Sequence, residues 1–520
     1  MMFSFNKFLD PQTKEPGGFF GRLFGHSEKK DGNSSENAKA LNLDDIQGFI
    51  LRGYRMPLVR HFLLTVHEPA KAREMLGRLV NGNESDAPQI TTAIDWHVGF
   101  EPGPYDNIKD LPKRKPDYCL NVGITWPGMI ALEVKNRVGG ISFKSFDAYT
   151  LGAAVRAPKV GDTGDSGPEN WVGDFGKGSD HVLITLHAMS PEAMESYTNR
   201  LTFLFHEGNA FHEVWRQDGA AIIEMVDGKP TPTAKVHFGY TDGLSMTNIK
   251  GGPEKTQRDP QKECEPWLFV LQDEAENYNV PQPRELGLNG SFAVFKMLET
   301  DVVGFENYLQ SNKDKIDPEL LAAKICGRWR NGVPLMLSPE TDKPEAGITP
   351  DEINNFDYVN ADGTGDPKGI RCPVGAHMRR INPRGQPVPG QGQPGGSNTT
   401  HRLMRRGLPY GPVYDPTKPY DQIPRGLLGY FINSNIENQY EFVLSEWVNN
   451  GEFAGSVRLD SKSKDPMIGA QNPDESIFVI PQPFGAPSIK LKGFNSFVTT
   501  KAAAYCFLPS ITALKFISKL

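Results

Sequence analysis

The sequence predicts an α+β fold with two lobes, each of which packs helices on an antiparallel β-sheet of the split β-α-β, ferredoxin-like kind. Three observations lead to this prediction. Short apolar segments typical of strands are followed directly by segments whose apolar residues recur with helical spacing. The same order of segments occurs in both halves of the chain. A hydrophilic stretch, residues 251–266, separates the halves and is the expected join.

The first half supplies the strands and helices of an N-terminal lobe, residues 43–255. Its predicted elements are, in order, a strand at 60–66, a helix at 69–80, a strand at 117–126, a strand at 180–189 and a helix at 190–205. Ser190 is a suitable N-cap for the last helix, and Pro191 fits its first position.

The second half repeats this rhythm in a C-terminal lobe, residues 265–520. A strand at 290–300 precedes a helix at 301–312 with Asp301 as its N-cap. A second strand at 427–434 precedes a helix at 435–450. Residues 1–42 are polar and glycine-containing, and we expect them to form a flexible N-terminal arm.

Composition excludes several classes of protein. The net charge of −7 gives no general basic surface for nucleic acid. The five cysteines are odd in number and form no CxxC pair, which fits a reducing compartment better than a disulfide framework or a zinc ribbon. No secretory or twin-arginine signal and no apolar run of about 18 residues is present, so we expect a cytoplasmic protein without a membrane partner.

Two motifs look chemical but lack the context that their chemistry needs. Residues 390–395, GQGQPG, match the GxGxxG dinucleotide pattern, but no strand precedes them and no helix follows. His206 and His212 are six residues apart, whereas the zinc motif HExxH needs a spacing of four to place both rings on one helix face. We interpret the first as a surface loop and the two histidines as structural or exposed.

His377 lies in a short apolar segment of the stretch RCPVGAHMRRINPR, residues 371–384. Four arginines accompany it: Arg371, Arg379, Arg380 and Arg384. A histidine ligand beside guanidinium groups suits an anionic cofactor that carries a metal, and haem with its two propionates is such a cofactor. A solvated basic loop is the alternative interpretation of these residues.

Asp242 is an acid in the largely apolar, aromatic and glycine-containing segment HFGYTDGLSM, residues 237–246. A carboxylate without a partner is costly to bury. The cluster HRLMRRGLPYGP, residues 401–412, contains Arg402, Arg405 and Arg406, any of which would supply the missing positive charge. Such a pair alone would be a salt bridge, whereas a pair that faces an open metal site would suit peroxide chemistry.

The segment GYTDG, residues 239–243, resembles the GxxDG signature of the dye-decolourising peroxidases. Further blocks resemble that family in the same order, at 290–309, 323–335, 372–384, 401–412, 426–450 and 465–471. The resemblance runs from about Leu43 to the C-terminus, and the length is similar to that of the larger class of the family. It implies two ferredoxin-like lobes of the dimeric α+β barrel type and one haem b per chain.

The resemblance also implies roles for individual residues next to the iron. His377 would be the proximal ligand of the haem iron, Asp242 the distal acid–base residue and Arg405 the distal arginine. Asp465, in the segment DPMIG, would accept a hydrogen bond from the other ring nitrogen of His377, with Glu437 as the alternative acceptor.

Further residues would shape the rest of the haem site. Arg384 and Arg379 would meet the propionates. Leu428 and Tyr430 would line the distal pocket, where the family often has Phe at the position of Tyr430. Gly239 and Gly243 would let the backbone approach the flat cofactor closely.

The function implied is that of a peroxidase, monomeric or homo-oligomeric, that uses hydrogen peroxide to oxidise bulky organic donors such as dyes and phenolics through a high-valent iron-oxo intermediate. An aspartate base suits an acidic pH optimum. Three alternatives stay open: a haem-binding carrier or sensor, a haem-processing, iron-releasing protein of the same fold, and a catalytically silent assembly module.

Overall fold

One large antiparallel β-sheet organises the protein. The structure is a computed structural model that describes residues 41–82, 87–94, 116–134, 141–253, 263–272, 280–344, 347–349, 352–388, 399–453 and 459–520. Within this part of the chain, residues from Leu41 to Leu520 form one compact unit. The expected arm at 1–42, except for its last two residues, lies outside the described residues, and so do 254–262 of the expected join and all of the 390–395 loop.

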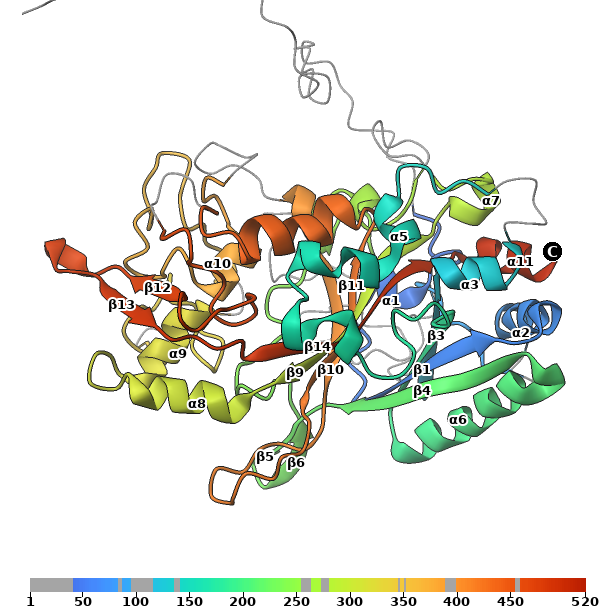
Figure 1. Cartoon of the computed structure of the whole chain (residues 1–520), viewed down its shortest axis with the longest axis horizontal. Coiled ribbons are helices and arrows are strands. Elements are labelled where there is room, and N and C mark those ends of the chain that lie inside the picture. Colours follow the sequence, from blue (N-terminus) through green and yellow to red (C-terminus); the bar gives the residue numbers. More distant parts are fainter. Residues whose placement is uncertain are drawn as a thin grey trace, which may run out of the picture. The chain divides into compact units, whose positions relative to one another are not determined.

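The first half of the chain builds one end of the sheet, with the strand order β4–β1–β3–β2 (Figure 1). Along the sequence the elements are β1 (Leu58–Val66), α2 (Pro69–Asn81), β2 (Tyr118–Thr125), β3 (Val182–Ala188), α6 (Pro191–His206) and β4 (Phe211–Ala220). The sequence predicts the first five of these elements, and β4, which it did not predict, completes the β-α-β-β-α-β order. Ser190 caps α6 as expected, because its side chain accepts a hydrogen bond from the backbone N–H of Ala193 at 3.2 Å.

The second half continues the sheet with the order β10–β11–β9–β14. Its elements are β9 (Ser291–Thr300), α8 (Val302–Ser311), α9 (Pro318–Cys326), β10 (Met404–Tyr410), β11 (Gly426–Asn433), the helical segments η9 (Glu437–Glu441) and η10 (Val443–Val448), and β14 (Val498–Leu508). Asp301 caps α8 as expected, since its carboxylate accepts from the N–H of Gly304 at 2.8 Å. The fold class is therefore α+β, as predicted. The exact limits of the two lobes, 43–255 and 265–520, stay a prediction.

The helix expected at 435–450 is wound more widely than an α-helix. Both η9 and η10 are π-helical. The N–H of Glu441 bonds the carbonyl of Ile436 at 2.8 Å, and the N–H of Asn449 bonds that of Leu444 at 3.0 Å, so each bond spans five residues. π-Helical turns are rare and frequently occur at functional sites. This helix contributes to the wall of the cavity described below.

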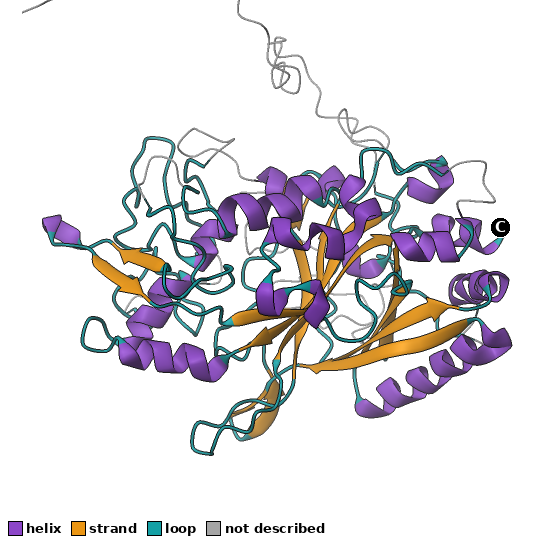
Figure 2. Ribbon diagram, in the orientation of Figure 1, coloured by secondary structure: helices purple, strands orange, loops and turns teal. Residues whose placement is uncertain are grey.

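The remaining elements are short and surround the sheet (Figure 2). The helices are α1 (Gly48–Leu51), α3 (Trp126–Ala131), α5 (Asp147–Arg156), α7 (Arg284–Gly287), α10 (His377–Ile381) and α11 (Ile511–Ser518). The strands are β5 (Ile223–Val226), β6 (Lys229–Pro232), β7 (Asn248–Ile249), β8 (Glu263–Cys264), β12 (Ile477–Ile480) and β13 (Ile489–Lys492). None of the helices in the described part of the chain has the length and apolar composition needed to cross a membrane.

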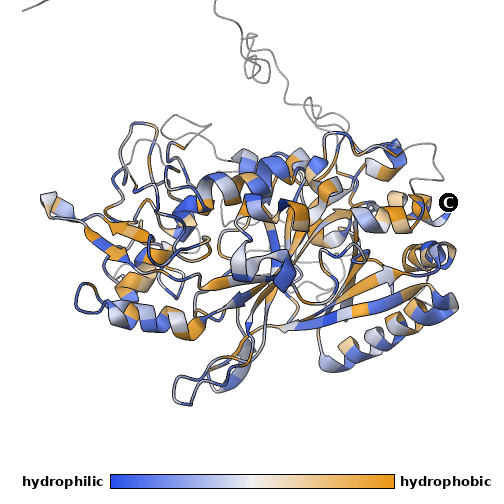
Figure 3. Ribbon diagram, viewed as in Figure 1, coloured by the Kyte–Doolittle hydropathy of each residue, from blue (hydrophilic) through white to orange (hydrophobic). Residues whose placement is uncertain are grey.

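The hydrophobic core follows the sheet. The largest cluster of buried side chains draws on both halves of the sheet, with Phe62 and Ile184 from the first and Phe295 and Ala504 from the second. Apolar colouring in Figure 3 accordingly concentrates on the inner strands, whereas the edge strand β4 is largely hydrophilic. Burial of both faces explains why the inner strands read as nearly continuous apolar runs.

The two halves of the sheet meet at a short junction between β14 and β2. Only Cys506–Thr125 and Phe507–Ile124 are paired there. The fully buried side chain of Gln47 extends the connection, because its Nε2 donates to the carbonyls of Val122 at 2.9 Å and Pro509 at 2.8 Å. Its Oε1 accepts from the N–H of Val122 at 2.9 Å. One amide side chain thus hydrogen-bonds both β2 and the residue that follows β14, and so strengthens the short junction.

We expect Gln47→Leu to lower the free energy of unfolding by about 2–4 kcal/mol, because it leaves several buried backbone groups without partners. Chemical denaturation followed by fluorescence measures this change. Gln310→Leu, at an exposed position of α8, is the matched control and should change stability by less than about 0.5 kcal/mol. Equal effects of the two substitutions would contradict the role given to Gln47.

Candidate functional site

A cavity of about 820 Å³ lies against one face of the second half of the sheet. Its walls include residues of β9, β10, β11, α10, η9 and η10, together with the loops at 160–166 and 468–473. The volume is in the range of cofactor and small-molecule sites. Asp242, His377 and Arg405, which are far apart in the sequence, all line it. The cavity therefore brings together the three residues on which the sequence interpretation depends.

His377, the first residue of α10, is held by a buried acid. Its Nδ1 donates to Oδ2 of Asp465 at 2.9 Å, and the Asp465 side chain is fully buried. The other carboxylate oxygen of Asp465 accepts the backbone N–H groups of Met467 at 2.9 Å and Ile468 at 3.0 Å. Burial alone would raise the pKa of Asp465, but His377 and the Ile468 N–H hold it below its usual value. An ionised acceptor fixes the proton of the imidazole on Nδ1.

The other nitrogen of the ring, Nε2 of His377, has no hydrogen-bond partner among the described residues. Its lone pair is therefore available to a ligand in the cavity. No group of three or more His, Cys, Asp or Glu side chains that could hold a bare metal ion occurs in the described ranges. A single neutral imidazole of fixed tautomer would suit a metal that a macrocycle already holds.

Asp242 and Arg405 form an ion pair in the cavity wall. Nη1 of Arg405 lies 3.0 Å from Oδ1 of Asp242. The two side chains keep 37% and 30% of their accessible surface because they face the cavity. The N–H of Gly243 also donates to Oδ1 of Asp242, at 2.6 Å. Desolvation alone would raise the pKa of Asp242, but the charge of Arg405 and the Gly243 N–H keep it below its ordinary value.

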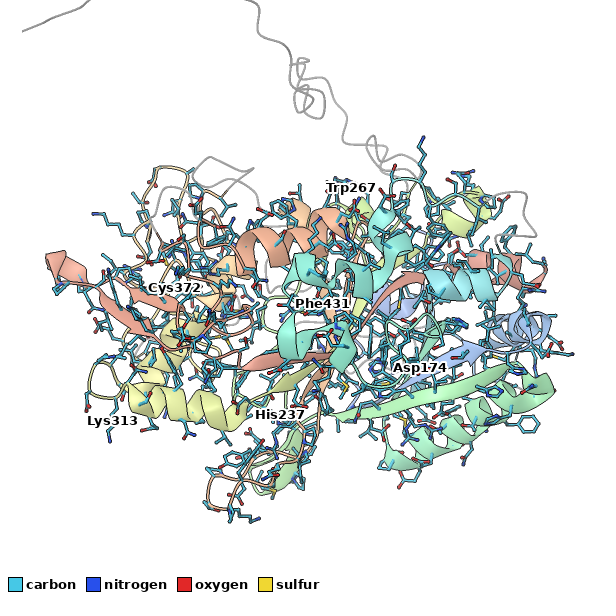
Figure 4. The ribbon with its side chains drawn as sticks, viewed as in Figure 1. Asp174, His237, Trp267, Lys313, Cys372 and Phe431 are labelled. Carbon is cyan, nitrogen blue, oxygen red and sulfur yellow. The ribbon has the colours of Figure 1, made fainter. Side chains whose placement is uncertain are left out.

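Sheet register decides which side chains of β11 face the cavity. Arg405 on β10 lies opposite Phe431, and Gly429 lies opposite Lys296 on β9. Because opposed residues share a face and successive residues alternate, Leu427, Gly429 and Phe431 are on the side of Arg405. Figure 4 places Phe431 among the central strands.

Leu428 and Tyr430, which were expected to line the distal pocket, border the cavity, but their side chains point to the opposite face. Tyr430 packs against Phe49 and Phe295, and its hydroxyl is hydrogen-bonded to that of Thr185 at 2.8 Å. Successive side chains of a strand point to opposite faces of the sheet, so the side chains that face the cavity are those of the neighbouring residues, Leu427, Gly429 and Phe431.

Arg379 and Arg384, the expected propionate partners, lie behind the cavity wall and are not among its lining residues. Arg379 is fully buried and donates to the carbonyl of Cys372 at 2.7 Å and to Gln386 at 2.5 Å. Arg384 donates to the carbonyl of Asn354 at 2.6 Å. Both guanidinium groups stabilise the loops that follow α9 and α10.

Three other expected residues also lie away from the cavity. Glu437 pairs with Arg156 at 3.5 Å and does not line the cavity, so the structure places Asp465 and not Glu437 beside His377. Gly239 and Gly243 are likewise not lining residues. Their φ angles of 83° and 71° are in the left-handed region, so a tight turn requires glycine at both positions.

The cavity wall contains a buried charged pair that sequence reasoning missed. Nζ of Lys296 contacts Asp162 and lies 3.0 Å from Oγ1 of Thr500, and all three residues line the cavity. Lys296 is the single charged residue inside the apolar stretch 291–298 of β9. A lysine in a buried strand needs a partner, and this was the signal available in the sequence.

Comparison with known proteins identifies the relatives of the chain. No protein-family model matches it. It is 27% identical over 446 residues to a dye-decolorizing peroxidase from Mycena epipterygia, which covers 83% of this chain and 76% of that protein. Peroxidase 2 from Mycetinis scorodonius is 26% identical over 491 residues, which cover 91% of this chain and 87% of that one.

A solved structure shares the fold over the same length. It is a dye-decolorizing peroxidase in complex with 2,6-dimethoxyphenol, with 26% sequence identity and a TM-score of 0.74, and the match covers 92% of this chain and 100% of that chain. Sequence and fold thus agree over nearly the whole described chain. The named relatives and the solved structure both support the dye-decolourising peroxidase family, and the chain is itself a peroxidase.

Proposed function

We propose that the chain binds one haem b, with His377 as the ligand of its iron, and that Asp242 and Arg405 act on hydrogen peroxide at the other side of the cofactor. One observation carries this proposal: the His377–Asp465 pair and the Asp242–Arg405 pair meet at the same cavity of about 820 Å³. A carrier or sensor of haem would need the first pair but not the second.

The residues around the cavity fit a haem. The free Nε2 of His377 would hold the iron, and apolar side chains such as Val443, Leu444 and Ile468 would contact the macrocycle. Arg402 and Lys464, two basic residues of the wall, are the candidates for the propionates in place of Arg379 and Arg384. Haem bound there supplies a redox-active iron that peroxide oxidises and that organic donors reduce again.

Asp465 prepares His377 for this role. A carboxylate that accepts the Nδ1 proton orients the ring, keeps the lone pair on Nε2 and makes that nitrogen more basic. His377 and the backbone N–H of Ile468 hold the pKa of Asp465 below its usual value, and the N–H groups of Met467 and Ile468 both donate to its carboxylate. The Asp465 side chain therefore sets both the direction and the donor strength of the ligand.

Asp242 would move the proton that lets one oxygen of peroxide leave as water when the O–O bond breaks. The ionised carboxylate takes a proton from one peroxide oxygen and returns it to the oxygen that leaves. Arg405, 3.0 Å away, keeps Asp242 ionised and stabilises negative charge on the departing oxygen. Neither residue needs to rearrange, because the ion pair already faces the cavity.

The reducing substrates we propose are bulky organic donors, dyes and phenolics. The relative from Mycena epipterygia and the solved structure are dye-decolorizing peroxidases, and that structure holds 2,6-dimethoxyphenol. Peroxide-dependent bleaching of an anthraquinone dye by the purified holoprotein tests this. Haem binding without any turnover would instead support the carrier or sensor, and release of iron from haem would support the haem-processing alternative.

We expect His377→Ala to lose haem or to bind it far more weakly, because no other side chain replaces Nε2. Asp465→Asn should weaken haem binding by about 10- to 100-fold, the usual effect of removing a partner that orients a ligand. Haem content per chain and the Soret band measure both effects, and His212→Ala, on the edge strand β4, is the control. Full haem content with an unchanged Soret band in His377→Ala would refute the ligand assignment.

We expect Asp242→Asn to slow the reaction with peroxide by about 10²- to 10⁴-fold and Arg405→Leu by about 10²- to 10³-fold, with haem retained in both. Stopped-flow absorbance after mixing with peroxide measures the rate constant. Asp44→Asn, at an exposed position, should react like the unmodified protein. If Asp242→Asn also did so, Asp242 would not be the base.

The pH dependence of this rate constant should reflect Asp242. Only the ionised carboxylate accepts a proton, and its pKa lies below the ordinary value of an aspartate, about 3.9. The rate constant should therefore stay level from neutral pH down to about pH 4 and fall as the carboxylate is protonated below that. In Arg405→Leu the fall should begin at higher pH, since the charge that lowers the pKa is gone. A maximum above neutral pH would argue against Asp242 as the base.

A further inference from the structure

Arg330, which follows α9, is hydrogen-bonded to the loop that carries Asp242. Its Nη1 donates to the backbone carbonyl of Phe238. Its own backbone carbonyl accepts the N–H of Thr241 at 2.9 Å and the hydroxyl of Thr241 at 3.2 Å. Thr241 directly precedes Asp242, so one residue holds the loop at two points before the acid.

Two helices hold the guanidinium group of Arg330 from its other side. Nη2 donates to Glu306 of α8 at 2.8 Å, and Nε donates to Glu319 of α9 at 3.1 Å. The group also lies over the rings of Tyr240 and Phe305, 5.6 and 5.9 Å from their centroids. All three nitrogens of the guanidinium group are thus engaged, and this fixes the position of the side chain.

Gly239 allows this contact. A Cβ atom at Gly239 would lie 3.1 Å from Nη1 and 3.3 Å from Cδ of Arg330, closer than most carbon contacts. The φ angle of 83° at Gly239 also favours glycine. The first glycine of the 239–243 segment therefore faces Arg330, whereas the sequence interpretation placed it against the cofactor.

We propose that Arg330 is a positioning residue for Asp242: by tying the 238–241 backbone to α8 and α9, it keeps the carboxylate within reach of Arg405 at the cavity. Arg330 is not among the residues that line the cavity and so acts through the loop. A misplacement of a catalytic group by about 1 Å can cost about 100-fold in rate. This inference rests on the proposed role of Asp242.

The test uses the haem-loaded full chain with Arg330→Gln. This substitution keeps much of the side chain but removes its charge and the hydrogen bonds of the guanidinium group to Phe238, Glu306 and Glu319. We expect the rate constant with peroxide to fall by about 10- to 100-fold while haem content and the Soret band stay unchanged. The fall at acidic pH should also begin at higher pH, because Asp242 is no longer held at Arg405. The charged groups that face Asp242, Arg405 from β10 and His377 from α10, are intact in this variant.

Gly239→Ala is an independent way to disturb the same contact and should give the same two changes. The double variant should react with peroxide no more slowly than the slower single variant, because both substitutions remove one shared contact.

Arg330→Lys keeps the charge without the forked geometry, and its rate constant should lie between those of Arg330→Gln and the unmodified protein. This milder variant serves if Arg330→Gln does not fold.

Arg73→Gln separates loss of stability from loss of positioning. Arg73 is also a buried arginine and donates to the carbonyl of Leu132 at 2.7 Å, but it does not contact the 237–243 loop. We expect Arg73→Gln to lower thermal stability without changing the rate constant or its pH profile.

If Asp242→Asn slows the reaction while Arg330→Gln and Gly239→Ala match the unmodified protein in rate and pH profile, the positioning role is overturned and the proposed function stands. If Asp242→Asn has no effect, both are overturned.

Discussion

A charged carboxylate at the wall of a cavity must have a partner. For Asp242 the partner and the contacts that hold its loop come from the second half of the chain. Asp242 comes from a loop and Arg405 from β10, and their side chains meet at 3.0 Å. The loop is tied to α8 and α9 through Arg330. Arg405 is fixed by strand pairing with β11. The ion pair thus links a loop, a sheet and two helices.

A second acid beside the cavity, Asp465, also has partners for its charge, but here they are a histidine ring and backbone N–H groups. Asp465 is fully buried, and it stays charged because His377 and two backbone N–H groups bond it. Each acid in the candidate site therefore has a role that follows from its surroundings. Asp242 is partly accessible, which suits the proposed exchange of a proton with a small molecule, whereas Asp465 is sealed and hydrogen-bonds the ring of His377.

Several features were predictable because they depend on local sequence. The strands and helices at 58–81, 182–206 and 291–311 follow from apolar spacing and from the caps Ser190 and Asp301. His377 and Asp242 stood out because a ligating or charged side chain in an apolar segment needs a reason. Resemblance alone selected Arg405 from Arg402, Arg405 and Arg406. Leu428, Tyr430, Arg379 and Arg384 were placed in the pocket by resemblance alone, and the structure turns their side chains elsewhere.

The amino-acid sequence alone was enough to predict the α+β class, the order of most elements and the need of Asp242 for a partner, since each of these depends on residues close together in the chain. Which partner each residue has is visible only in the folded chain. Strand register turned Phe431 and not Tyr430 toward Arg405, and packing of α9 brought Arg330 to Gly239. Contacts of this kind join residues about ninety or more positions apart, as in Arg330 with Phe238 and His377 with Asp465. Neither spacing nor propensity encodes such distances, because they are set by how the whole sheet and its helices pack.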